Sequence, residues 1–397
     1  MKSEWMQATL DEVCALITDG AHNSPKSVEM GYYMASVKNF TDFGFDFSDC
    51  RKISKTDYEK LRKQGCVPEK GDILVGKDGA RYFEDIVIYN QDEEPALLSS
   101  IAILRVDDKK ITSEFLYYTL KTPIVRKDVR DNYGSGSAIP RIVLKDFRRM
   151  PFSYPSIEEQ KKITTICSTI DFKIQLNNKI NENLLEQMKA LYKSWFVDFE
   201  PFNGKQPQSW HQNNIYSLAN IIYGAPFSSK QFNTDGNGKP IIRIRDLKEQ
   251  RFATYTTEKH PKGYLLQPGD IVVGMDGEFR PYIWGNDEAW LNQRVCVFDN
   301  IRPEGKAFLY FTIKPLLYAI EQTQVATTVI HIGKKDFDAF KVIIPETTVL
   351  NRFDAITSPM VKQIISNSFE NKQLASLRDA LLPKLMSGEL DVSNLDI

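Results

Sequence analysis

The sequence carries an internal repeat that extends over most of its 397 residues. Residues 71–79, Gly-Asp-Ile-Leu-Val-Gly-Lys-Asp-Gly, recur 198 positions later as residues 269–277, Gly-Asp-Ile-Val-Val-Gly-Met-Asp-Gly. Further along, residues 115–118 (Phe-Leu-Tyr-Tyr) match residues 308–311 (Phe-Leu-Tyr-Phe) at a smaller offset. An offset that drifts in this way is expected of duplicated domains whose surface loops differ in length. We therefore expect two copies of one globular domain.

Each copy is followed by a long segment with helical periodicity. Ser156 and Glu159 have the Ser-x-x-Glu spacing of a capping box, which predicts a helix start. Apolar residues then recur every three or four positions and so share one face of the helix. They are Ile163, Ile166, Ile170, Ile174, Ile180, Leu184 and Leu191. The stripe returns 190 residues later as Phe353, Ile356, Met360, Ile364, Leu374 and Leu381. A period close to 3.5 predicts that the two helices pack as a coiled coil.

Asn177 and Asn367 interrupt the two stripes at equivalent positions. Each is either a solvated polar position or one half of a buried Asn–Asn pair that fixes the helix register. We expect the helix-pair and partner interface to include the following residues: Ile163, Ile166, Ile170, Asn177, Leu184, Leu191, Ile356, Met360, Asn367, Leu374, Leu377 and Leu381.

The segments that precede the helices are rich in short β-branched and aromatic runs bounded by Gly, Asp and Asn, which are typical of strands. We therefore predict an α+β fold in which two repeated globular domains are each followed by a long helix. The predicted boundaries are residues 1–155 and 203–346 for the domains, 156–202 for the central helix, and 347–397 for the C-terminal helix and tail.

Composition restricts the possible functions. The formal net charge is −1, so a nucleic-acid binder of this composition must concentrate its positive charge locally. The five cysteines include no Cys-x-x-Cys pair, which favours free thiols in a reducing cytoplasm over disulfides or a zinc site. No apolar run approaches the ~18 residues of a membrane-spanning helix, and the first residues lack a signal-peptide pattern. We expect a cytoplasmic protein.

The sequence contains no recognisable catalytic constellation. It has no Gly-x-x-x-x-Gly-Lys-Ser/Thr phosphate loop, and its four histidines lie far apart without cysteines at ligand spacing. The Asp-Gly pairs at residues 78–79 and 276–277 are more typical of turns than of catalytic carboxylates. We expect no metal, cofactor or catalytic residue in this chain.

Positive charge is concentrated in each repeated domain. Residues 121–149 hold eight Lys and Arg against three Asp, and residues 239–251 form a second basic cluster. Such runs are often solvated surface, but Arg and Lys also contact phosphates and guanine, while hydroxyl groups reach other base edges. The candidate DNA contacts in the first domain are Lys77, Arg81, Tyr133, Ser135, Ser137, Arg141 and Lys145. Those in the second domain are Arg243, Arg245, Arg280, Thr327, Thr328, His331 and Lys334.

Three segments resemble those of a known family. Residues 154–163, residues 190–202 and residues 377–390 are similar to the helix starts and ends of specificity (S) subunits from type I restriction–modification enzymes. The resemblance implies two target-recognition domains on two antiparallel helices with pseudo-two-fold symmetry. Each domain would read one half of a bipartite double-stranded DNA target.

The resemblance also implies that the chain is not itself catalytic. Its helices would set the spacer between the half-sites and dock two methyltransferase (M) subunits, which use S-adenosylmethionine to methylate adenine. Restriction/translocase (R) subunits would supply the ATP- and Mg-dependent endonuclease activity.

The two domains differ strongly outside the repeated segment, so we expect an asymmetric target. Three alternatives remain open at this point. They are the recognition subunit of a modification-only methyltransferase complex, a scaffold that binds protein alone, and an enzyme of unrecognised mechanism.

Overall fold

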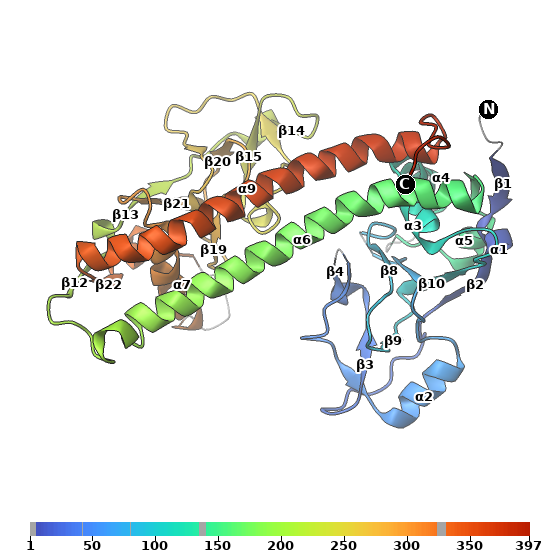
Figure 1. Cartoon of the computed structure of the whole chain (residues 1–397), viewed down its shortest axis with the longest axis horizontal. Helices are drawn as coiled ribbons and strands as arrows, with labels where there is room; N and C mark the ends of the chain where they lie inside the picture. Colours follow the sequence, from blue (N-terminus) through green and yellow to red (C-terminus); the bar gives the residue numbers. More distant parts are fainter. Residues whose placement is uncertain (1–4, 42, 80, 135–139, 324–330) are drawn as a thin grey trace. The chain divides into compact units, whose positions relative to one another are not determined.

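The computed structural model describes residues 5–41, 43–79, 81–134, 140–323 and 331–397. The chain divides into two compact units, each of which contains one copy of the repeat. Unit 1 consists of Met1–Asp171 with Ala375–Ile397, and unit 2 consists of Phe172–Leu374. Each unit combines one globular domain with parts of the two long helices α6 (Ile157–Phe196) and α9 (Thr347–Met386) (Figure 1).

Both units are built around a four-stranded antiparallel sheet with the same strand order. In unit 1 the order is β2 (Cys14–Asp19), β10 (Ile101–Val106), β7 (Ile73–Gly76) and β8 (Ile86–Ile88). In unit 2 it is β13 (Ala219–Tyr223), β21 (Val295–Asn300), β18 (Ile271–Gly274) and β19 (Pro281–Ile283). The repeated Gly-Asp segment forms β7 in one unit and β18 in the other. The repeat in the sequence is therefore a repeat in the structure.

The central strand of each sheet is buried on both faces. In β7, Ile73 and Val75 belong to a cluster that includes Phe115, whereas Leu74 belongs to a second cluster with Val87. Side chains alternate between the two faces of a strand, so a strand that is covered on both sides needs an uninterrupted apolar run. This requirement explains why Ile-Leu-Val and Ile-Val-Val follow the two Gly-Asp pairs.

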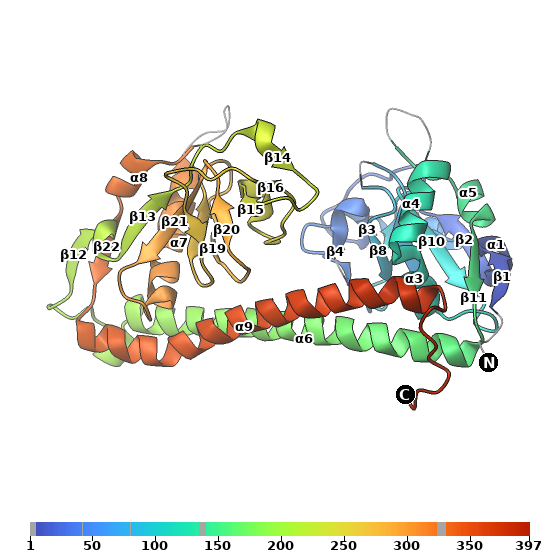
Figure 2. The same ribbon diagram turned by 90° about the horizontal axis from the view of Figure 1, so that it is seen from above.

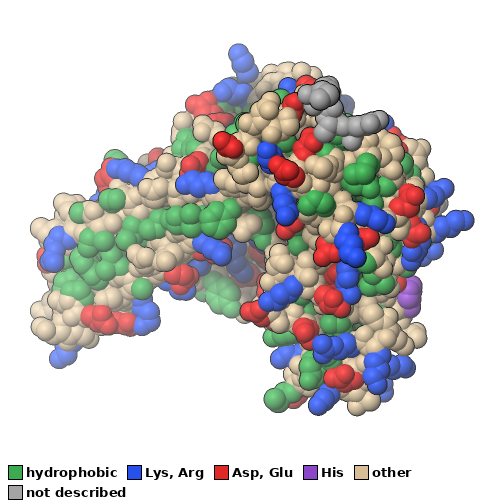
Figure 3. Space-filling view, turned by 45° about the vertical axis from the view of Figure 1, so that its right-hand side comes forward, with side chains coloured by type: hydrophobic (Ala, Val, Ile, Leu, Met, Phe, Trp, Pro, Cys, Tyr) green, Lys and Arg blue, Asp and Glu red, His purple; other side chains and the backbone are tan. Residues whose placement is uncertain are grey.

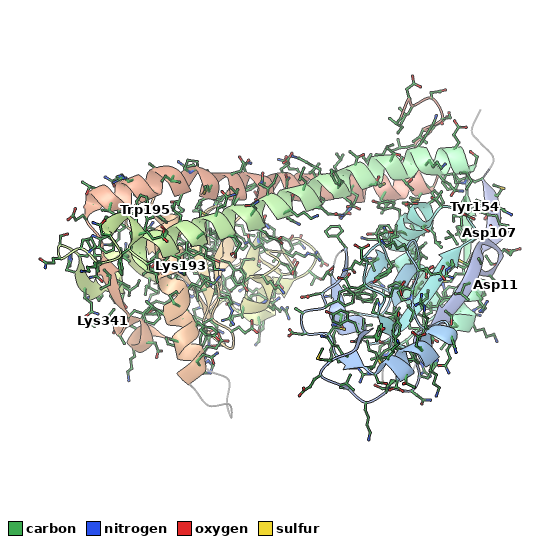
Figure 4. The ribbon with its side chains drawn as sticks, turned by 60° about the horizontal axis from the view of Figure 1, so that its bottom comes forward. Asp11, Asp107, Tyr154, Lys193, Trp195 and Lys341 are labelled. Carbon is green, nitrogen blue, oxygen red and sulfur yellow. The ribbon has the colours of Figure 1, made fainter. Side chains whose placement is uncertain are left out.

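Helices cover one face of each sheet. The helix α3 (Ser113–Lys121) in unit 1 and α7 (Lys306–Thr323) in unit 2 each lie between their sheet and the long helices (Figure 2). In unit 2, Trp195 projects from α6 (Figure 4), and its ring centroid lies 5.8 Å from that of Phe353 on α9. Phe196 packs against Phe308 of α7 with ring centroids 4.9 Å apart. These contacts anchor the second globular domain on the helix pair.

Shorter elements complete each unit. Unit 1 also contains α1 (Leu10–Val13), α2 (Lys55–Lys63), α4 (Pro123–Asn132), α5 (Leu144–Arg149), β1 (Met6–Thr9), β3 (Tyr32–Ala35), β4 (Phe40–Thr41), β5 (Gly44–Phe45), β6 (Lys52–Ile53), β9 (Ala96–Leu97) and β11 (Pro151–Tyr154). Unit 2 also contains α8 (Lys334–Asp338), β12 (His211–Asn214), β14 (Phe232–Asn233), β15 (Lys239–Ile242), β16 (Tyr255–Thr256), β17 (Leu265–Leu266), β20 (Ala289–Leu291) and β22 (Lys341–Ile344).

The long helices pack antiparallel, as predicted. In unit 1 the Arg378 guanidinium donates to Asp171 at 2.7 Å. In unit 2 the side-chain amide of Asn177 donates to Glu370 at 2.8 Å. Residues with higher numbers on α6 thus contact residues with lower numbers on α9, so the two helices run in opposite directions. The predicted α+β fold with two repeated domains and an antiparallel helix pair is confirmed.

Neither alternative for Asn177 and Asn367 is found, because both residues are buried rather than solvated and they do not pair with each other. Asn177 donates to Glu370 and to Asn371, whereas Asn367 donates to Asn181 at 2.8 Å. The prediction was wrong because an apolar stripe defines which face is buried but not which residues face each other. In this register each asparagine lies about one helical turn from the position opposite the other.

The predicted stripe residues differ in how far the structure buries them. In unit 1, Ile163, Ile166, Ile170 and Leu381 are buried or packed against the domain core, and in unit 2 Leu184, Leu191 and Met360 do the same. Leu374 is half-buried. By contrast, 44% of Ile356 and 49% of Leu377 remain exposed. No helix in the described part of the chain has the length and apolar character needed to cross a membrane.

Candidate nucleic-acid interface

In both units the Asp-Gly pair that ends the repeated segment forms a backbone bridge with a polar or charged residue at the surface. In unit 1, Asp78 forms an isolated antiparallel bridge with Arg141, and the amide of Ile142 donates to the Lys77 carbonyl at 3.0 Å. In unit 2 the corresponding bridge joins Asp276 to His331. The Asp-Gly turn therefore fixes Arg141 and His331 at equivalent places, and both are exposed.

The glycine of each Asp-Gly pair has a physical reason to be there. Gly79 has a φ of 96° and Gly277 a φ of 79°. This left-handed region is open to glycine but costly for side chains with a Cβ. The turn interpretation of these two pairs is thereby supported.

Lys77 lies in the interior of unit 1, although we predicted a DNA contact for it. Only 8% of its side chain is exposed, and its Nζ lies 3.3 Å from Asp19 and 3.7 Å from Asp78. A cation that is enclosed by two carboxylates has little reach to a phosphate or a base. Its geometry supports a role in holding the strand ends that present Arg141.

Unit 2 arranges different groups around the same turn. Met275 takes the place of Lys77, and Asp276 contacts the Nδ1 of His331 at 2.5 Å. Arg294 lies 3.8 Å from the same carboxylate oxygen and has a positive φ of 72°. Arg294 and the two aspartates were not among the predicted site residues. Sheet register brings Arg294 there, because the Met275 amide donates to the Arg294 carbonyl.

The other candidates of unit 1 lie at the surface with mixed partners. Arg81 is largely exposed and pairs with Asp85 at 2.8 Å, and Lys145 is exposed on α5. Tyr133 is half-buried, with the Arg149 guanidinium 5.1 Å from its ring centroid, and burial raises the pKa of its hydroxyl. Ser135 and Ser137 lie outside the described residues. Figure 3 shows that Lys and Arg on the visible face of unit 1 are interspersed with Asp and Glu.

Two candidates of unit 2 share one carboxylate. The Nε atoms of Arg243 and Arg245 lie 3.6 Å and 3.8 Å from Asp246, and Arg243 also bonds to Thr254. Asp246 is buried, while Arg245 points into solvent. Arg245 is therefore the better placed of the two for a DNA phosphate.

Arg280 and Lys334 each have an acidic partner within unit 2. Arg280 binds Glu321 through two nitrogens, which raises the pKa of Arg280 and lowers that of Glu321. Lys334 is exposed on α8 and lies 3.0 Å from Asp338. Thr327 and Thr328 lie outside the described residues. The structure thus places His331 and Lys334 in one short surface segment and Arg243 with Arg245 in another.

The part of α6 in unit 2 has an exposed apolar stripe. Phe172, Leu176 and Ile180 recur every four residues and expose 65%, 41% and 38% of their surfaces. Figure 3 shows apolar side chains gathered along the long helices. We predicted an interface on these helices from other positions and missed Phe172 and Leu176, because their exposure depends on which face the domain covers.

The described residues hold no cluster of His, Cys, Asp and Glu that could bind a metal ion. The features found instead are a duplicated sheet, an anchored surface residue at the same place in each copy, and a helix pair. Together they define a protein with two equivalent modules carried on one pair of long helices.

Comparison with known proteins identifies the modules. The family of the type I restriction modification DNA specificity domain matches residues 2–186 and again 207–367. The chain belongs to this family, and its two tandem specificity domains serve DNA sequence recognition. The family is that of the specificity component of these systems, not of a catalytic one.

Known relatives agree with this assignment. The chain is 28% identical to the type I restriction enzyme MjaIX specificity subunit of Methanocaldococcus jannaschii, over 72% of this chain and 71% of that protein. It is 31% identical to the EcoBI specificity subunit of Escherichia coli, over 47% of this chain and 41% of that protein. The crystal structure of an S subunit from M. genitalium shares the fold, with a TM-score of 0.52 and 17% identity over 97% and 96% of the two chains.

Proposed function

We propose that each recognition domain reads one half of a bipartite DNA target, and that the two halves differ in sequence. One observation carries the proposal. The equivalent turns of the two sheets present Arg141 in unit 1 and His331 in unit 2. Arginine offers only donors to a base edge, whereas histidine can accept. Two domains with one backbone and different reading groups suit an asymmetric target.

Contacts to the DNA backbone have their own candidates. Arg81, Lys145, Arg245 and Lys334 are exposed cations outside the turn. Phosphate contacts set position and affinity but carry no sequence information, and they make binding depend on salt. We assign these four residues to phosphates, and Arg141 and His331 to base edges.

The helices serve as the docking surface for methyltransferase subunits and fix the spacer between the half-sites. The exposed stripe Phe172, Leu176 and Ile180 supports docking, because an apolar row on a helix gains stability when a partner covers it. We assign S-adenosylmethionine, ATP and Mg to the methyltransferase and restriction subunits, and none of them to this chain. In a restriction complex, two methyltransferase subunits and the restriction/translocase subunits join it.

The test is methylome sequencing of cells that express the chain with its methyltransferase partner. We expect methyladenine in a split motif with two unlike halves. Cells with the methyltransferase but without this chain provide the control and should lack the motif. A palindromic motif would contradict the asymmetry, and an active methyltransferase complex that methylates no specific motif would contradict the recognition role itself.

A further inference from the structure

We propose that His331 is a specificity-determining residue of the second recognition domain. Its Nε2 accepts a hydrogen bond from the exocyclic amino group of an adenine or cytosine in the major groove. Asp276 is the positioning residue that makes His331 an acceptor. This inference rests on the proposed function, because it concerns how one of the two domains reads its half-site.

The contact between Asp276 and His331 sets the tautomer of the ring. An ionised carboxylate can only accept, so the imidazole nitrogen that faces it carries the proton. The Nδ1 of His331 lies 2.5 Å from the Asp276 carboxylate. In the neutral ring, Nε2 then holds the lone pair. Among the described residues Nε2 has no hydrogen-bond partner, and 54% of the side chain is exposed.

A nearby cation also contacts the Asp276 carboxylate. The Nη1 of Arg294 lies 3.8 Å from the same Asp276 oxygen. Arg294 thus shares the negative charge of Asp276, and the hydrogen bond between Asp276 and His331 uses only the Nδ1 proton of the ring. Arg294 also leaves 56% of its side chain exposed beside the ring, where it can contact a phosphate.

Backbone contacts hold the pair on the side of Met275 and Ile332. His331 bridges Asp276, and the amide of the next residue, Ile332, donates to the Met275 carbonyl at 2.9 Å. Ile332 is 3% exposed and packs in the core of unit 2. A reading group needs such support, because a base contact loses its selectivity when the side chain can move away.

Unit 1 gives the opposite chemistry at the same place. There the backbone of Asp78 bridges Arg141, but its carboxylate lies 3.7 Å from Lys77 and has no ion pair with Arg141 among the described residues. Within the described part of the chain, the guanidinium of the anchored residue, Arg141, has no ion-pair partner. Arginine presents donors, which match the N7 and O6 acceptors of guanine, whereas a histidine Nε2 acceptor matches adenine N6 or cytosine N4. The two domains therefore read opposite kinds of base edge at this position.

The experiment compares methylomes of cells that express the methyltransferase partner with the wild-type chain, His331→Arg, Asp276→Asn or His331→Gln. We expect His331→Arg to change the preferred base at one position of one half-site to guanine, by about tenfold. Asp276→Asn should relax the same position, because an amide can donate or accept and no longer sets the tautomer. His331→Gln should keep the original base, because its amide oxygen is also an acceptor.

Two readouts separate this role from a structural one. The other half-site should stay unchanged in every variant, and so should the thermal unfolding midpoint. His211→Gln, which changes an exposed histidine on β12, is the matched control and should leave the whole motif as in wild type. A wild-type motif that His331→Arg leaves unchanged, or weakens equally at all positions, overturns this inference alone. A wild-type chain that directs no motif overturns the proposed function with it.

Discussion

Units 1 and 2 share a backbone plan but differ in the groups that they bury at equivalent positions. In unit 1, Asp171 of α6 accepts from Arg378 at 2.7 Å and from the Tyr118 hydroxyl at 2.8 Å. The equivalent residues of unit 2 are Val361, Met188 and Phe311, which all lie in one apolar cluster. Unit 1 thus has an ion pair and a tyrosine hydroxyl where unit 2 has three apolar side chains.

The sheets show the same difference twice more. Asp72 and its counterpart Asp270 both accept from a backbone amide, but Asp72 is also bound by two nitrogens of Arg105 at 2.8 Å and 2.9 Å, whereas Asp270 accepts from the Tyr264 hydroxyl. Burial accordingly raises the pKa of Asp270. Lys77 and Asp19 likewise correspond to Met275 and Tyr223. Figure 4 marks Asp11, whose pairing with Arg148 at 2.5 Å adds another charged contact in unit 1.

The difference teaches that, at these equivalent positions, the two copies diverged in their charges while the four-stranded sheet kept the same strand order. A buried ion pair adds little net stability over an apolar pair, but the loss of one partner is costly because the other charge stays buried. Unit 1 should therefore be sensitive to single charge removals and tolerant of paired ones. Unit 2 should be less sensitive to substitutions at the positions equivalent to these.

The largest effect is expected from Arg378→Met. It leaves Asp171, whose side chain is 9% exposed, without its cation, and should destabilise unit 1 by about 3–4 kcal/mol. Hydrogen exchange of the α3 amides, which lie beside this pair, measures the loss locally. The double variant Asp171→Val with Arg378→Met introduces two of the three unit 2 residues and should recover part of the lost stability, because the Tyr118 hydroxyl still loses its acceptor. A double variant less stable than the single one would break the comparison.

Lys77→Met should have the next largest effect. It introduces the unit 2 residue, Met275, at the equivalent place in unit 1 and leaves the Asp19 carboxylate without its lysine. We expect the free energy of unfolding to fall by about 2–3 kcal/mol. The loss is smaller than for Arg378→Met because His22 still lies 3.2 Å from that carboxylate. The thermal unfolding midpoint should fall. The first half-site should keep the same preferred bases, since Lys77 is enclosed and acts on the DNA contact only through the strand ends that present Arg141. A stable variant with an altered first half-site would show that Lys77 contacts DNA after all.

Asn177→Leu tests the polar contacts between α6 and α9 in unit 2. The side chain is buried, but its partners Glu370 and Asn371 reach solvent and can be hydrated when it is lost. We expect stability to rise by about 1 kcal/mol, because a polar residue in an apolar seam is retained at a cost. Urea denaturation of the full chain measures the change. A loss of stability of similar size would mean that the amide bonds, not the apolar contacts, hold this segment.

The smallest effect on stability is expected from Lys334→Ala, since exposed ion pairs contribute about 0–1 kcal/mol. Its consequence should appear in DNA binding instead. The affinity of the assembled complex should fall by a similar factor for specific and non-specific DNA. The slope of log affinity against log salt should fall by about 1, as for one lost phosphate contact. A changed base preference with an unchanged slope would reassign Lys334 to base reading.

The fold could be predicted further than the site. The repeated segments and the helical stripes are local patterns, and both were confirmed. The pairing of Asn177 with Glu370 and Asn371 could not be predicted, because it depends on the register between helices far apart in sequence. The exposure of Phe172 and Leu176 could not be predicted either, because it depends on which helix face the globular domain covers.

The site was predictable only in part, for a related reason. Basic residues can be counted in a sequence, but their burial cannot, and Lys77 was taken for a surface cation. Arg294 belongs to the turn through strand register and a positive φ, neither of which leaves a sequence signal. The candidate contacts themselves stay predictions. The Asp-Gly pairs did carry information, because the turn they form is what anchors Arg141 and His331.

The most direct test of the account is a side-by-side methylome of the wild-type chain and of the two matched variants Arg141→Ala and His331→Ala. The account predicts a split, asymmetric wild-type motif. Arg141→Ala should relax one position in one half, and His331→Ala should relax one position in the other half. If both variants relax the same half, or if the wild-type motif is palindromic, the two domains do not read separate and unlike half-sites and the central claim is wrong.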